Sequence, residues 1–68
     1  MKPKSLPPAE AAKVSAGLGA LMLAESIREV HKGQFGSAWR DRESAEMHFR
    51  AAVAALDGIA AAKRGRGR

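Results

Sequence analysis

The 68-residue sequence contains no cysteine and no tyrosine, and it has only two phenylalanines and one tryptophan. The lack of cysteine excludes disulfides, which small domains often use to compensate for a thin core. A chain of this length buries only about 60% of the surface that it exposes when unfolded. Self-association is therefore an expected source of stability. The lack of cysteine also fits a reducing compartment, and we expect a cytoplasmic protein.

No apolar run is long enough to cross a bilayer. The longest candidate, residues 14–24, falls well short of the roughly 20 residues that a transmembrane helix needs. Two lysines precede this run, as in a secretion signal, but a glutamate and two prolines lie between them and the run. Met22 is also too large for the usual cleavage pattern. We expect neither membrane insertion nor export.

The residue patterns that support catalysis or metal binding are missing as well. No serine lies in a nucleophile-elbow context, and no cysteine can act as a nucleophile. His31 and His48 fall on different predicted helices, too far apart to share a metal, and a metal site needs three or four ligands. Glu43 and Glu46 lie one turn apart, but arginines surround them and Glu46 is spaced to pair with Arg50. The sequence predicts no enzyme and no catalytic, cofactor-binding or metal-binding residue.

Fifteen alanines and the lack of any alternating apolar pattern indicate an all-α fold. Pro8 suits the first position of a helix, and Gly33 is a good stop after about residue 32. Ser37 is a suitable N-cap for a second helix after a loop at 34–36. The predicted organisation is a flexible arm at 1–6, an antiparallel two-helix hairpin at 7–62 with helices at about 8–32 and 37–62, and a disordered basic tail at 63–68.

The two predicted helices differ in their apolar pattern. Helix 2 has one seam with spacings of 3 and 4, formed by Arg42, Ala45, Phe49, Ala52, Leu56 and Ile59. Helix 1 has two seams on nearly opposite sides. The first seam comprises Ala11, Val14, Leu18 and Leu21, and the second comprises Ala16, Ala20, Leu23, Ile27 and Val30.

A hairpin that folds about residue 35 brings the first seam of helix 1 against helix 2. The expected pairs are Leu21 with Phe49, Leu18 with Val53, and Val14 with Leu56. The second seam is left in water, which forfeits about 1.5–3 kcal/mol for each large side chain. We therefore predict that another chain covers it, with two hairpins dimerising into a four-helix bundle.

Two alternatives change what this second seam does. Gly17 and Gly19 could break helix 1 and let its second half turn inward. Near the loop, Trp39 is either a binding anchor, because tryptophan is enriched at interface hot spots, or a packing residue. We expect Trp39 and Phe35 to pack over the loop end of the hairpin. The predicted dimer or partner surface comprises Ala20, Leu23, Ile27, Val30, Phe35 and Trp39.

The net charge of +5 is concentrated at the two ends of the chain, because residues 5–62 carry a net charge of −1. The tail KRGRGR resembles the core of an AT-hook, although Gly67 stands where that motif has proline, and it resembles Arg-Gly RNA-binding tails. A solubilising tail is an equally good interpretation. If the tail binds nucleic acid, the contacts are expected from Lys63, Arg64, Arg66 and Arg68.

Two functions remain after these exclusions. The first is a small regulator, inhibitor or adaptor that forms a homodimer and modulates a larger protein through apolar helix surface, as phage and mobile-element proteins often do. The alternative is a DNA- or RNA-binding protein in which a dimeric hairpin carries two basic tails. No cofactor is expected for either function.

Overall fold

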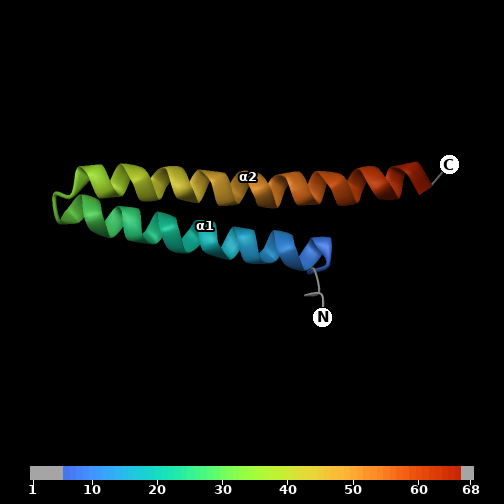
Figure 1. The fold of residues 1–68 in the computed structure, drawn as a ribbon, viewed down its shortest axis with the longest axis horizontal. Helices are drawn as coiled ribbons and strands as arrows, with labels where there is room; N and C mark the ends of the chain where they lie inside the picture. The colour runs from blue at the N-terminus through green and yellow to red at the C-terminus, as the bar shows by residue number, and fades with distance from the viewer. Residues whose placement is uncertain (1–5, 67–68) are drawn as a thin grey trace, which may run out of the picture.

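A computed structural model describes residues 6–66 of the chain, which form two helices, α1 (Pro8–His31) and α2 (Phe35–Arg66). The helices run in opposite directions side by side, joined by a short turn, so that the start of α1 and the end of α2 lie toward the same end of the hairpin (Figure 1). The described residues contain no strand. The predicted all-α helical hairpin is confirmed.

The boundaries of α1 follow from local sequence signals. Pro8 occupies the first turn and Glu10 lies beside it, where a carboxylate interacts favourably with the helix dipole. Gly33 has φ of 78°, a left-handed conformation that glycine adopts without strain, and it ends the helix as predicted. The helix is continuous through Gly17 and Gly19, so the predicted alternative of a broken helix 1 is wrong.

Helix α2 is longer than predicted at both ends. It begins at Phe35 and not at Ser37, because the Ala38 amide already donates to the Gln34 carbonyl at 3.0 Å. Ser37 therefore lies in the first turn and is not the N-cap. At the other end, α2 continues through Arg66, so the prediction of a disordered tail is wrong for 63–66, because a single glycine lowers helix stability without ending a helix. Arg68 lies outside the described residues.

The two helices meet through small side chains at intervals of seven residues. This spacing returns each residue to the same side of its helix after two turns. All six of these residues are buried, and they are the only buried residues in the described part of the chain. We call them the small-residue seam: Ala12, Gly19 and Ser26 on α1, and Ala38, Ala45 and Ala52 on α2.

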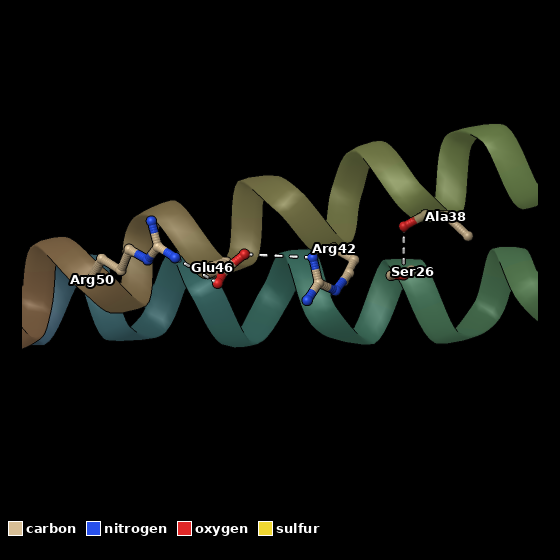
Figure 2. A network of polar contacts seen from close by, with 5 residues as sticks. All are labelled: Ser26, Ala38, Arg42, Glu46 and Arg50. Carbon is tan, nitrogen blue, oxygen red and sulfur yellow. Dashed lines mark hydrogen bonds and ion pairs between the residues drawn. The ribbon is translucent and has the colours of Figure 1, made fainter.

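The small-residue seam corrects the predicted packing of the hairpin. Leu18, Leu21 and Val53, which were expected between the helices, are exposed. The physical reason is that small residues let two helix backbones approach closely, whereas leucine and phenylalanine would hold them apart. One result is an interhelical hydrogen bond in which the Ser26 hydroxyl donates to the Ala38 carbonyl at 2.7 Å (Figure 2).

Gly19 and Gly17 are expected to respond in opposite ways to substitution by alanine. A Cβ at Gly17 would meet no atom within 4 Å, so Gly17→Ala should stabilise the helix by about 1 kcal/mol. A Cβ at Gly19 would lie 2.9 Å from two ring carbons of Phe49. The gain in helix propensity is then opposed by overpacking, which typically costs about 1–3 kcal/mol.

Thermal unfolding followed by circular dichroism measures this difference. We expect the Tm of Gly17→Ala to exceed that of Gly19→Ala by at least about 4–8 °C, because 1 kcal/mol corresponds to such a shift in a domain of this size. Equal increases in Tm for the two variants would show that Gly19 is not a point of close helix approach.

Candidate interaction surface

The large apolar side chains of the hairpin lie on its outside. Every leucine, valine, phenylalanine and tryptophan in the described residues is at least 36% exposed, whereas the buried apolar residues are four alanines. Each large side chain left in water forfeits about 1.5–3 kcal/mol of burial energy. Such a surface indicates a molecule that binds something through apolar contact.

Both helices contribute to one broad apolar face, which we call the front surface. Its α1 members were predicted as the uncovered seam, and its α2 members include three residues that were expected inside the hairpin. The front surface comprises Leu23, Ile27 and Val30 on α1, and Phe35, Trp39, Phe49, Val53 and Leu56 on α2. The predicted residue Ala20 is also exposed, one turn from Leu23 along the same stripe.

Two shallow grooves show that the two helices share this face. Leu23 of α1 and Phe49 of α2 line one groove. Nearer the loop, Val30 lines a second groove together with Phe35 and Trp39. Phe35 and Trp39 of α2 thus lie beside the second seam of α1, and Phe49, which was expected against Leu21 between the helices, lies on this side as well.

A second apolar stripe, the rear surface, lies on α1 at Val14, Leu18 and Leu21. At 100° per residue, these side chains project to one side of the small-residue seam, whereas Leu23 and Ile27 project to the other. All three are exposed, and Leu21 is 64% exposed. The hairpin therefore presents apolar side chains on both of its broad sides.

Trp39 and Phe35 do not pack over the loop end. Trp39 is 60% exposed and Phe35 is 67% exposed, so the prediction that they serve as packing residues of the hairpin is wrong. The reason is again the small-residue seam, because Ala38 fills the interface at this level and leaves no room for an indole. The Arg42 guanidinium covers part of the Trp39 ring at 4.9 Å from its centroid, a cation–π contact.

Arg42, Glu46 and Arg50 form a row of ion pairs along α2 (Figure 2). The Glu46 carboxylate accepts from Arg42 at 3.4 Å and from Arg50 at 3.0 Å. The predicted pairing of Glu46 with Arg50 is confirmed. Solvent-exposed pairs of this kind contribute only about 0.2–1 kcal/mol each to stability. These charges on the front surface therefore bear more on what this surface can bind than on the stability of the fold.

The surroundings of Glu29, near the turn on α1, raise the pKa of its carboxyl group. Its Oε1 atom is buried and has no hydrogen-bond partner. Burial and the neighbouring Asp41 carboxyl, with a smaller contribution from Glu25, raise the pKa of Glu29, and Lys32 partly opposes them. Two carboxyl groups from different helices therefore face each other near the turn.

This raised pKa predicts that acid stabilises the hairpin. The folded chain holds the Glu29 proton more tightly than the unfolded chain, so protonation of Glu29 stabilises the folded state. This contribution to stability is complete below the pKa that Glu29 has in the unfolded chain. It is lost as the pH rises through the raised folded pKa. We expect Glu29→Gln to raise the Tm at neutral pH and to flatten its dependence on pH.

Thermal melts of the wild type, Glu29→Gln and a control, Glu43→Gln, across the mildly acidic range test this prediction. Glu43 is exposed on α2, and its replacement should leave the slope of Tm against pH unchanged. A wild-type Tm that rises with pH across this range would contradict the prediction.

The last three basic residues of α2, Lys63, Arg64 and Arg66, lie at the end of the hairpin away from the turn, which we call the open end. There α2 extends past the start of α1, since it has 32 residues against 24 (Figure 1). Pro8 lines a groove with Ile59 and Lys63, so the last turns of α2 project beyond the hairpin. Lys63 and Arg64 are exposed on these turns, and Arg66 is the last residue of α2.

Comparisons with protein-family models, curated proteins and solved structures find no match to this chain. Within residues 6–66, no helix is both long and apolar enough to cross a membrane. The same residues contain no group of three or more His, Cys, Asp or Glu side chains placed to hold a metal ion. The candidate site of this protein is therefore its two-sided apolar surface.

Proposed function

We propose that the protein is a small non-enzymatic regulator or adaptor that forms a homodimer in the cytoplasm and docks on a larger protein. The observation that carries this proposal is the presence of large apolar side chains on both broad sides of the hairpin. A second copy covers one side of a hairpin. The opposite side then needs a different partner, because exposed apolar patches in soluble proteins usually mark binding surfaces.

The front surface is the better candidate for self-association, because it is broader and includes the three aromatic side chains. The rear surface, at Val14, Leu18 and Leu21, then remains for the target. Its three aliphatic side chains form a stripe one to two turns long, a size suited to one helix or groove of another protein.

A pull-down from nuclease-treated lysate with the tagged protein tests this function. We expect the wild type to capture a defined protein, and Leu21→Glu to lose it while keeping the mass and helicity of the wild type. Lys13→Glu is a matched control that places the same charge on an exposed position of the same helix. Equal capture by Leu21→Glu and the wild type would refute docking through the rear surface.

Nucleic-acid binding is the second candidate, and the observation that favours it is the projection of Lys63 and Arg64 at the open end. Helical phosphate contacts of this kind give binding that weakens steeply with salt. Deletion of residues 63–68 separates the two functions. If the protein still captures its target after the deletion and after nuclease treatment, the adaptor function is supported. If each of the two treatments abolishes capture, nucleic-acid binding is supported.

A further inference from the structure

On the front surface, six side chains of α2 form a seam with heptad spacing. When the seam is aligned with a reversed copy of itself, basic positions meet acidic positions and apolar positions meet apolar positions. Its residues are spaced by 4 and 3: Phe35, Trp39, Arg42, Glu46, Phe49 and Val53. One basic and one acidic residue occupy the middle, with an aromatic residue on each side and a further apolar residue beyond each aromatic. The midpoint of this series falls at residue 44.

This order fits an antiparallel copy of the same helix. If α2 of a second chain runs in the opposite direction with its residue 44 at the same level, Arg42 lies level with Glu46 of the partner subunit. Trp39 then lies level with the partner's Phe49, and Phe35 with the partner's Val53. Every basic position faces an acidic one and every apolar position faces an apolar one. A parallel copy would instead place Arg42 against the partner's Arg42.

The charged pair is already arranged for such a contact. Arg42 and Glu46 form an ion pair at 3.4 Å, and both side chains are about half exposed, so each keeps capacity for further hydrogen bonds (Figure 2). The cation–π contact with Trp39 also helps to hold the Arg42 guanidinium over the front surface. The partner's Glu46 and Arg42 would complete a cluster of four alternating charges.

Helix α1 can also pair with α1 of a second chain, centred at the level of residue 44 of α2. Leu23 lines the same groove as Arg42, Ala45 and Glu46, so it lies level with the midpoint of the α2 series. The partner's Leu23 would therefore meet Leu23 at the twofold axis. Ile27, four residues beyond Leu23, then lies close to the level of the partner's Ala20, three residues before Leu23.

Further along α1, Val30 lies opposite the partner's Ala16. Ile27 and Val30 then each face a small side chain across the interface, which allows close packing on both sides of the Leu23 pair. The apolar side chains of the front surface are 36–67% exposed, so a second copy has a broad apolar area to cover.

We propose that the front surface binds a second copy of this chain in an antiparallel arrangement, α2 against α2 and α1 against α1, and that Arg42 and Glu46 fix its register. This inference rests on the homodimer of the proposed function and adds its geometry. Its tests use purified protein alone, so their failure is distinguishable from a failure to capture a target through the rear surface.

Charge reversal tests the register. Arg42→Glu gives four facing acidic side chains in a homodimer, and Glu46→Arg gives four basic ones, so each variant alone should dimerise at least tenfold more weakly than the wild type. An equimolar mixture should recover a heterodimer, because every facing pair is then opposite in charge. The repulsion within each helix is not relieved by mixing, so recovery reports contacts between chains.

Native mass spectrometry and sedimentation measure these species, with circular dichroism to confirm helicity. Wild-type protein that stays monomeric, or single variants that dimerise as tightly as the wild type, would overturn the proposal. A mixture that contains no heterodimer would overturn it as well.

Cross-linking tests the direction of the partner. The chain has no cysteine, so each introduced thiol is unique. A short bis-maleimide should join Ala16→Cys to Val30→Cys in a mixture and should join neither variant to itself. Self-cross-linking of Val30→Cys would indicate a parallel partner, and no cross-link in any sample would exclude contact between the two α1 helices. Either result would overturn the arrangement even if the charge variants failed to fold.

Discussion

Replacing Ala45 with leucine is expected to disrupt the hairpin more than any substitution on its outer surface. Ala45 is only 1% exposed, less than the three other buried alanines of the hairpin. It lies between two points of close helix approach, the contact of Gly19 with Phe49 and the hydrogen bond from Ser26 to Ala38. Three added carbons have no space there unless the helices separate.

Overpacking of this kind costs about 1–3 kcal/mol and occasionally more, a large part of the few kcal/mol that a single core of this size supplies. Ala45→Leu should therefore lower the Tm by roughly 4–8 °C for each kcal/mol lost. The control is Ala54→Leu, the same change at an exposed position of α2, which should leave the Tm nearly unchanged. Similar Tm values for the two variants would contradict a hairpin held together by small residues.

Ile27→Asp is expected to convert the proposed dimer to a monomer. Ile27 is 55% exposed on the front surface of the hairpin. A twofold dimer contains this position twice, and the loss of each buried isoleucine forfeits about 1.5–3 kcal/mol. Dimerisation should weaken by roughly 10²- to 10⁴-fold, since 1.4 kcal/mol corresponds to a factor of ten.

Sedimentation across a concentration series measures this effect. Leu21→Asp is the matched control, because it places the same charge on the rear surface of the same helix. We expect Leu21→Asp to keep the wild-type dimer mass. If Leu21→Asp dissociates the dimer and Ile27→Asp does not, the rear surface is the self-association face and the assignment of the two surfaces is reversed.

The ends of α1 and the hairpin itself could be predicted from sequence because local residues determine them. Pro8 has a fixed φ and no amide hydrogen to lose, so it starts a helix, and Gly33 alone adopts the left-handed conformation that ends it. Both features act within one turn of the chain. No knowledge of tertiary packing is needed to predict them.

The face on which the helices pack could not be predicted from the positions of large apolar residues. Leu18 and Phe49 have the greater burial energy, and sequence reasoning therefore placed them inside. On α1 the structure instead places Gly19 and Ser26 there, and of the seam predicted on α2 it buries only the small members, Ala45 and Ala52, because close approach favours residues that carry almost no apolar surface. Burial energy ranks such residues last, so they look like filler in a helix rich in alanine.

A signal for the small-residue seam was nevertheless present in the sequence. Small residues recur at intervals of seven on both helices, at Ala12, Gly19 and Ser26 and again at Ala38, Ala45 and Ala52. The burial of small residues in place of large ones also explains why Leu23, Ile27 and Trp39 are exposed. Once the inner positions are filled by alanine, serine and glycine, nearly every large side chain must lie on one of the two outer surfaces.

The greater length of α2 determines how the basic residues are distributed in an antiparallel dimer. The open ends of the two hairpins then point in opposite directions, each extending beyond the turn of the other copy. With a rise of 1.5 Å per residue, the two copies of Lys63 lie roughly 57 Å apart along the bundle. Such a dimer would present two separate positive tips, which could reach two anionic partners at once but could not both contact one compact target.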